Sequence, residues 1–334
     1  MREQFGDARC VSRRGRTADG HEVKCAAMSP VANVAPLAGT ACAQAAQVSI
    51  NFVNLSAWKV FVLGIIQGIT ELLPISSTAH LRIVPALLHW PDPGSAFSAA
   101  MQLASLVAVL TFLWPDVTRL TGQAAAALAR NNWRDHSLQM AASILVGTIP
   151  IGVAGLVLQK RLNQCDSPLR GIAVVAWACI VMGLLLVLAE WVGQRGRQGG
   201  RRTWNDLRFA DGIWVGIAQA FALIPGVSRS GSTLTAAIGL GMERATAAWF
   251  SFLLGVPAIV LAGLYELWQL RKAGLHAHGW ELLFVGLASG SVAAYAALWA
   301  LLRYLRNHTS LVFAWYRVLL GIFLLLGAAR GWFS

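Results

Sequence analysis

The chain has 334 residues, of which 56% are hydrophobic and only 13% are charged, and its mean hydropathy is +0.57. A soluble domain carries roughly a quarter charged residues, so this composition excludes an ordinary soluble enzyme and indicates an integral membrane protein. The formal net charge of +12 does not point to nucleic acid, because surplus Lys and Arg in a multi-spanning protein lie in the loops that set its topology.

The first 54 residues differ from the rest of the chain. Residues 1–27 mix basic and acidic side chains with little apolar periodicity, and Met28 opens a run rich in Ala, Val and Pro. Two interpretations stay open: an N-terminal extension that is disordered, or sequence upstream of a true start at Met28. A cleaved signal peptide fits poorly, because no compact apolar region follows the basic stretch. Residues 55–332 are expected to form a single membrane domain.

Apolar stretches long enough to span a bilayer, about 17 to 25 residues, recur from Ser56 onward. Two segments, Ser56–Trp90 and Asp211–Gly241, are broken at their middles by Pro, Gly, Ser and Thr. Each is expected to form a re-entrant hairpin, because irregular backbone at membrane depth is tolerated only inside protein or against water. The predicted full spans are residues 97–114, 140–158, 169–190, 246–268, 280–302 and 312–330.

The two broken segments resemble each other. Residues 64–67 (GIIQ) align with residues 216–219 (GIAQ), and each segment then has a proline that leads into a Ser/Thr-rich stretch. Three predicted spans follow each motif, which inverts the second copy relative to the first and lets the hairpin tips meet near the midplane. The expected fold is therefore an all-α integral membrane protein with six transmembrane helices plus two re-entrant helical hairpins. They form an inverted-topology repeat, with repeat one at residues 55–190 and repeat two at 211–332.

Loop charges indicate the orientation of this topology. With the N-terminal extension left out, the loops at 115–139, 191–211 and 303–311 carry more Lys and Arg than the loops on the other side. The positive-inside rule therefore places these three loops in the cytoplasm. Solvated or topological roles are expected for the charged residues near span ends, namely Glu190, Glu243, Arg244, Glu266 and Arg317.

The first hairpin contains an acidic residue between apolar neighbours. Glu71 lies four residues after Gln67, which places both side chains on one face of a helix. An ionised carboxylate inside a bilayer costs at least a few kcal/mol, so it is rarely present without a cation or a functional partner. We therefore expect Glu71 to be functional, whereas Gln67 is equally well explained by a bond to a neighbouring helix.

A polar cluster follows Glu71. Pro74 is expected to end the incoming half-helix, and Ser76, Ser77 and Thr78 suit the N-terminus of the outgoing one. The free N–H groups and dipole of such a terminus attract anions, and a phosphate would fit there. His80, about one turn after Ser77, is either a general acid or base or a structural hydrogen-bonding group, and its neighbours favour the first.

The second hairpin contributes Gly226, Ser228, Arg229, Ser230 and Thr233. Arginine stays charged and its planar guanidinium group can donate two hydrogen bonds to phosphate oxygens, while glycine lets backbone amides approach an oxyanion. Arg229 inside an apolar hairpin thus requires an anionic partner. The two candidates are a ligand phosphate, which we favour, and Glu71.

These stretches, residues 64–81 and 222–234, resemble the two signature regions of the bacitracin-resistance family of undecaprenyl-diphosphate phosphatases. Residues 97–110, 250–258 and 313–318 add to the resemblance. It implies removal of the terminal phosphate of undecaprenyl diphosphate, which recycles the lipid carrier for cell-wall synthesis and confers bacitracin resistance. It also implies a multi-pass protein of the bacterial cytoplasmic membrane, an active site open to the outer face, and a divalent cation, Mg²⁺ or Ca²⁺.

Residue roles follow from the same resemblance. It implies that Glu71 and Gln67 hold the metal, although Gln67 replaces the Glu seen in many members and makes a site with two carboxylates doubtful. Ala104 stands where Gly is frequent and should change only helix packing. The nucleophile stays open between Ser77, which we favour, and a metal-bound water. The implied catalytic residues are Glu71, Ser77, His80 and Arg229, and the implied substrate-binding residues are Gln67, Ser76, Thr78, Gly226, Ser228, Ser230 and Thr233.

The expected partners are a polyprenyl diphosphate and membrane lipid, with no nucleic acid and with a homodimer left open. A transporter such as a lipid-phosphate flippase is the main alternative, because inverted repeats with broken helices are typical of secondary transporters. Ser77 and His80 beside a carboxylate favour the enzyme, since transport does not require them. A non-catalytic assembly subunit would leave Glu71, His80 and Arg229 without a purpose.

Overall fold

The computed structural model describes residues 50–162, 171–195 and 200–332. The interpretation of residues 1–49 lies outside these ranges. The described part is helical, and its first element is a short 3-10 helix whose Phe52 is fully buried and packs against Phe97 with the two rings tilted. Packing onto the membrane domain therefore starts a few residues before the boundary drawn from the sequence. The elements are η1 (Asn51–Asn54), α2 (Ala57–Leu72), α3 (Ser77–Leu87), α4 (Ser95–Ala100), α5 (Gln102–Phe112), α6 (Trp114–Ala129), α7 (His136–Leu162), α8 (Ile172–Arg195), η3 (Trp204–Asp206), α9 (Phe209–Ala220), η4 (Phe221–Leu223), α10 (Arg229–Gly239), α11 (Arg244–Lys272), α12 (Ala277–Asn307) and α13 (Leu311–Ala329).

Five helices within the described ranges are long and apolar enough to cross a bilayer, namely α7, α8, α11, α12 and α13. A sixth crossing results if Ala96–Phe112 and Trp114–Ala129, which bend by 74° at their junction, count as one. These helices confirm the membrane protein expected from composition. They overlap the six spans predicted from apolar length.

One prediction about the loops is wrong. Most of residues 115–139 form helix α6 rather than a loop. Pro115 suits the first turn, where its missing N–H costs nothing, and the following Ala-rich sequence has high helix propensity. Leu120, Ala124 and Ala127 are buried while most of the other α6 side chains are exposed, so α6 packs one narrow face onto the protein.

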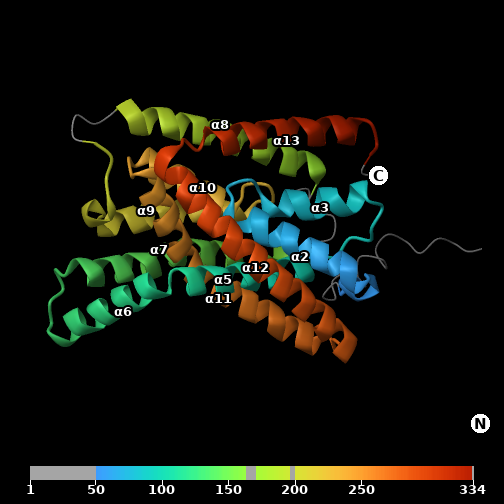
Figure 1. The fold of residues 1–334 in the computed structure, drawn as a ribbon, viewed down its shortest axis with the longest axis horizontal. Helices are drawn as coiled ribbons and strands as arrows, with labels where there is room; N and C mark the ends of the chain where they lie inside the picture. Colours follow the sequence, from blue (N-terminus) through green and yellow to red (C-terminus); the bar gives the residue numbers. More distant parts are fainter. Residues whose placement is uncertain (1–49, 163–170, 196–199, 333–334) are drawn as a thin grey trace, which may run out of the picture.

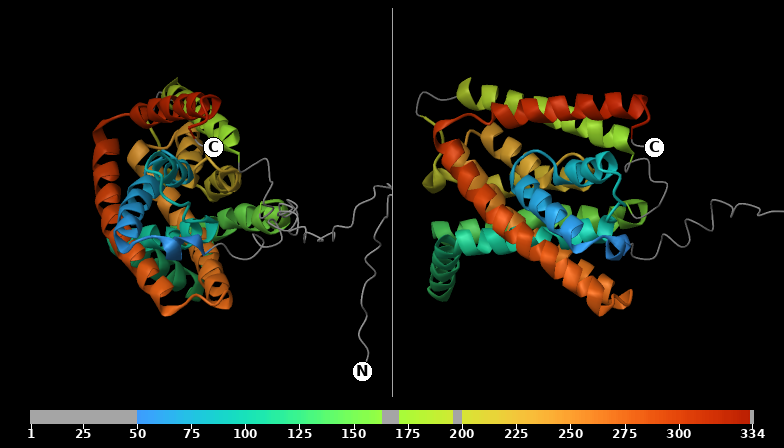
Figure 2. Two further views of the ribbon diagram at one scale, coloured as in Figure 1. Left: turned by 90° about the vertical axis from the view of Figure 1, so that its right-hand side faces the viewer. Right: turned by 45° about the vertical axis from the view of Figure 1, so that its right-hand side comes forward.

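The two broken segments form helical hairpins at the centre of the molecule. Figure 1 shows α8 and α13 along one edge, α5, α6 and α7 along the opposite edge, and α2, α3 and α10 between them. The turned views in Figure 2 agree, with the α2–α3 hairpin (blue to cyan) enclosed by longer helices. The polar middles of both hairpins are therefore surrounded by other helices.

The two halves of the chain pack on each other through equivalent pairs of helices. Helix α2 packs on α12 and α9 packs on α7, while α8 pairs with α13 and α5 with α11. Glycines allow the two hairpin contacts: a β-carbon on Gly64 would overlap Ser289 and the Gly286 backbone, and one on Gly216 would overlap the Gly147 backbone. The GIIQ and GIAQ motifs thus perform the same packing function in their two hairpins.

Buried charge at one end of the bundle corrects a second expectation. Glu190 is only 1% exposed, and its carboxylate accepts hydrogen bonds from Arg201, Arg244 and both the N–H and the hydroxyl of Ser310. Glu190 and Arg244 therefore join α8, α11 and the start of α13, rather than being solvated at span ends. Glu243, by contrast, is exposed as expected.

Candidate active site

Each hairpin tip ends at a serine in a left-handed backbone conformation. Ser76 precedes α3 with φ +73°, and Ser228 precedes α10 with φ +67°. Such a conformation costs a non-glycine residue about 1–3 kcal/mol and persists only where its surroundings fix it. The Ser228 hydroxyl accepts a hydrogen bond from the Gly231 N–H, and Ser76 is fully buried beside Thr78. Strain of this kind is typical of functional sites.

Glu71 is the centre of the site. One carboxylate oxygen accepts hydrogen bonds from Gln67 Nε2 at 2.9 Å and from Ser77 Oγ at 2.6 Å. The other oxygen forms an ion pair with Arg229 Nη2 at 2.6 Å, and the two charged side chains are 6% and 14% exposed. The carboxylate thus connects both arms of the first hairpin to the start of α10.

The structure shows one of the two partners considered for Arg229. The sequence favoured a ligand phosphate, but in the structure the guanidinium binds Glu71. Only Nη2 of Arg229 is bonded to Glu71, so the other guanidinium N–H groups remain available to a phosphate. The two partners therefore do not exclude each other.

Backbone groups join the two tips directly. The Ser230 hydroxyl donates to the carbonyl oxygens of Glu71 and Leu73, and the Gly226 N–H donates to Thr78 Oγ1 at 3.2 Å. These residues are more than 140 positions apart in the sequence. The structure thus brings the predicted residues of both hairpins into one site, as the paired motifs suggested.

Arg317 is the main residue that the sequence interpretation missed. It was expected near an interface, yet it is 0% exposed and its guanidinium donates to the carbonyl oxygens of Pro74, Gly226 and Val227. It therefore clamps both tips from α13. The available signal was its position in residues 313–318, one of the stretches that carried the family resemblance.

His80 is held away from Ser77. Its Nδ1 lies 2.8 Å from the Ser76 carbonyl oxygen, and its Nε2 lies 2.6 Å from the Tyr316 hydroxyl. The Ser77 hydroxyl hydrogen bonds instead to Glu71. Glu71, rather than His80, is thus the base within reach of Ser77, and Tyr316 is a second residue that sequence reasoning did not single out.

Two other predicted residues have different surroundings. The Thr233 hydroxyl donates to the Arg229 carbonyl oxygen within α10 and is fully buried, so it supports the first turn of this helix. Thr78 is exposed, and its hydroxyl bonds to the Gly226 N–H and to Ser76. Thr78 therefore lies at the open side of the tip contact.

Two polar oxygen atoms near Glu71 have no hydrogen-bond partner in the described part of the chain. Gln67 Oε1 is buried without a hydrogen-bond partner, and Ser251 Oγ, which lines a small cavity with Glu71 and Arg229, is also unpartnered. An unpaired buried acceptor costs about 1–3 kcal/mol, and Mg²⁺ and Ca²⁺ prefer carboxylate and amide oxygens. No group of three or more His, Cys, Asp or Glu that could hold a metal occurs within the described ranges. Among the described residues, the Glu71 carboxylate, the Gln67 amide oxygen and the Ser251 hydroxyl are the oxygen donors near this point.

The sequence is similar to those of known proteins over most of its length. The family model described as bacitracin resistance protein BacA matches residues 60–323. A relative from Mesorhizobium japonicum, named undecaprenyl-diphosphatase 2, is 56% identical over 268 residues, which cover 80% of this chain and 100% of the relative. Proteins named undecaprenyl-diphosphatase from Synechococcus elongatus and Gloeobacter violaceus are both 48% identical, over 83% of this chain and 95% and 94% of their own lengths.

Proposed function

Because the chain belongs to the bacitracin resistance protein family, we propose that it is an undecaprenyl-diphosphatase, a membrane hydrolase. It converts undecaprenyl diphosphate and water into undecaprenyl phosphate and inorganic phosphate. The observation that carries the proposal is the contact of Glu71 with both Ser77 and Arg229. This contact supports the roles that we propose for the three side chains: Glu71 as the base, Ser77 as the nucleophile and the Arg229 guanidinium as the phosphate-binding group.

Substrate binding rests on the two hairpin tips. The N-termini of α3 and α10 present backbone N–H groups and positive dipole ends, which suit the diphosphate. Arg229 then shares its fork between Glu71 and a terminal phosphate oxygen. Ser76, Ser228, Ser230 and the Gly226 backbone border the same space, while the isoprenoid tail lies between the apolar helices.

Proton transfer follows from the hydrogen bonds of Glu71. As the Ser77 oxygen attacks the terminal phosphorus, its proton passes to the carboxylate that it already contacts at 2.6 Å. The bond to the bridging oxygen breaks, and undecaprenyl phosphate leaves. The departing phosphate takes up the proton that Glu71 received. Water then cleaves the phosphoserine, with one of its protons passing to Glu71 and from there to the departing Ser77 oxygen. His80, held by Tyr316, supplies or accepts protons at the open side of the tips.

A divalent cation, Mg²⁺ or Ca²⁺, would be held by Glu71 and the unpartnered amide oxygen of Gln67. When bound, it supplies charge neutralisation for the phosphate oxygens. Gln67 also donates to Glu71, which keeps the carboxylate oriented toward Ser77 and Arg229.

The topology that we propose has six membrane spans and two re-entrant hairpins in an inverted repeat. The reciprocal packing of α2 on α12 and of α9 on α7 supports this topology, because a two-fold relation between the halves exchanges these pairs. In this arrangement α6 and the Arg-rich loops face the cytoplasm. The protein then lies in the bacterial cytoplasmic membrane with its site open to the outer face, where it recycles the cell-wall lipid carrier and confers bacitracin resistance.

Phosphate release by the purified protein in detergent tests the function. Wild-type protein should release phosphate from undecaprenyl diphosphate only when a divalent ion is present. Ser77→Ala should lose at least about 100-fold in kcat, because the nucleophile and its hydrogen bond are both removed. Ser291→Ala is the matched control, since this hydroxyl bonds only to the Leu287 carbonyl oxygen in its own helix.

The outcomes separate the alternatives. A flippase or an assembly subunit would release no phosphate in detergent, where transport has no meaning. If Ser77→Ala kept wild-type turnover, attack by water activated by Glu71 would replace the serine route. Loss of turnover in Ser291→Ala as well would mean that the assay reports folding and not chemistry.

A further inference from the structure

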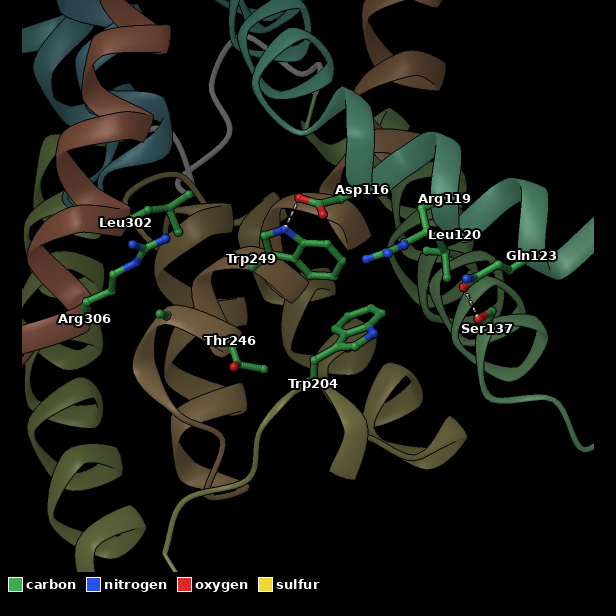
Figure 3. Close-up of a pocket in the computed structure, with 11 residues that line it drawn as sticks. Asp116, Arg119, Leu120, Gln123, Ser137, Trp204, Thr246, Trp249, Leu302 and Arg306 are labelled. Carbon is green, nitrogen blue, oxygen red and sulfur yellow. Dashed lines mark hydrogen bonds between the residues drawn. The ribbon is translucent and has the colours of Figure 1, made fainter.

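A second polar cavity, with a lining separate from that of the hairpin tips, lies at the end of the molecule where α6 lies and α11 begins (Figures 1 and 3). Its volume is about 350 Å³, within the usual range for small-molecule sites. Side chains from α6, α7, η3, α11 and α12 line it. Those used below are Asp116, Arg119, Gln123, Trp204, Trp249 and Arg306.

The arginines of this cavity differ from their neighbours. At the same end of the protein, Arg201 and Arg244 pair with Glu190, and Arg202 pairs with Asp211. Within the described part of the chain, neither Arg119 nor Arg306 has an acidic partner within 4.0 Å. The paired arginines join helices, whereas Arg119 and Arg306 are solvent-exposed and line the cavity.

The single carboxylate of the lining does not neutralise this charge. Asp116 is three residues before Arg119 on α6, a spacing at which the two side chains can pair. Asp116 instead accepts a hydrogen bond from Trp249 Nε1 at 3.0 Å. The cavity lining therefore carries a net positive charge, with the carboxylate held against the indole.

Aromatic side chains give the cavity a fixed wall. Trp204 and Trp249 meet edge to face with ring centroids 4.1 Å apart. Figure 3 shows the two indoles between Arg119 and Arg306, which project from opposite sides. Gln123 accepts a hydrogen bond from Ser137 through its carbonyl oxygen, so its amide N–H groups remain to donate. Two guanidinium forks and an amide thus surround one space.

This donor set fits a tetrahedral anion. Guanidinium groups bind phosphate oxygens in pairs, and the lining donors outnumber the free acceptors. We propose that this cavity, here named the arginine cavity, is a second anion site that binds a phosphate group. The group belongs either to a lipid monophosphate or to inorganic phosphate.

Fluorine NMR of the full chain labelled with 5-fluorotryptophan tests this site without relying on hydrolysis. Trp204→Phe and Trp249→Phe assign the two reporter signals. The labelled protein in detergent is titrated with inorganic phosphate and, separately, with farnesyl monophosphate, and sodium chloride of equal ionic strength serves as the salt control. We expect a saturable shift of both signals with at least one phosphate compound and none with chloride.

Matched variants locate the binding. Arg119→Gln combined with Arg306→Gln should raise the half-saturation concentration by about tenfold or more, because two charge-assisted contacts are lost. Arg130→Gln, an exposed arginine at the end of α6 outside the cavity lining, should bind like wild type. Arg119→Lys keeps the charge without the fork and should fall between them.

Each result bears on the proposal. A response to farnesyl monophosphate alone assigns the site to a lipid head group, and a response to inorganic phosphate assigns it to the free anion. No saturable shift with either compound would overturn the proposal. An unchanged titration in the double variant would overturn it as well, because the reporters would then be sensing another site.

Discussion

Replacement of Arg317 by Leu should disconnect the two hairpin tips from α13. The substitution removes a charged donor that bonds to the carbonyl oxygens of Gly226 and Val227 at 2.8 Å and of Pro74 at 3.3 Å. Each unpaired buried carbonyl costs about 1–3 kcal/mol. The three unpaired carbonyls together cost about 3–9 kcal/mol, and relief from burying the charged guanidinium offsets part of this, so we expect a net loss of roughly 3–5 kcal/mol.

The effect on catalysis should exceed the effect on substrate binding. A displacement of about 1 Å at a reacting group can lower the rate by about 100-fold. We therefore expect Arg317→Leu to lower kcat for phosphate release far more than it raises KM, and Arg317→Lys to recover part of kcat. Arg330→Leu, which removes an exposed arginine at the end of the same helix, is the matched control.

Thermal unfolding in detergent and steady-state phosphate release measure the two consequences. Wild-type Tm together with wild-type kcat in Arg317→Leu would refute the reasoning, because the tips would then hold without the clamp. A lower Tm with unchanged kcat would leave Arg317 a purely structural residue.

Three further predictions test the surroundings of the site. Gln67→Glu should tighten the apparent affinity for Mg²⁺, because a second carboxylate becomes available to the ion, and should lower Tm in EDTA, because the hydrogen-bond donor to Glu71 is replaced by a like charge. Unchanged Mg²⁺ titration curves would contradict a metal role for position 67. Tyr316→Phe should lower kcat about tenfold, because the lost hydrogen bond to His80 is worth about 1.4 kcal/mol. A pH–rate profile identical to that of the wild type would count against a role of Tyr316 in positioning His80. Gly216→Leu should reduce Tm and folded yield, at a cost of about 1–3 kcal/mol or more, because the new side chain overlaps the Gly147 backbone. Gly152→Leu, whose side chain meets open space, should change neither, and equal yields of the two variants would refute the close packing of α9 on α7.

The sequence predicted the parts of this protein that depend on local composition. Apolar length located the membrane helices, and the breaks around Pro74 and Pro225 located the hairpins. The charged and hydroxyl residues in those breaks could be identified because such groups are costly in a bilayer. Their meeting, through the Glu71–Arg229 pair, followed from counting the crossings between two similar motifs.

The parts that the sequence did not predict depend on tertiary contacts. Arg317 and Glu190 each lie in an apolar helix close to a predicted span end, where a charged residue usually reaches solvent. Whether such a side chain turns inward depends on partners far away in the sequence, here the tip carbonyls and Ser310. Helix α6 was missed for a similar reason, because its narrow apolar face counts only once the bundle covers it.

A double-mutant cycle on phosphate release tests the central claim, that Glu71 and Arg229 from separate hairpins act as one catalytic unit. The variants are Glu71→Gln, Arg229→Gln and the two combined, measured as kcat/KM with undecaprenyl diphosphate. Groups that act as a unit give non-additive losses, so we expect the double variant to be scarcely worse than the worse single variant. Losses that simply multiply, or a single variant with wild-type kcat/KM, would contradict the claim.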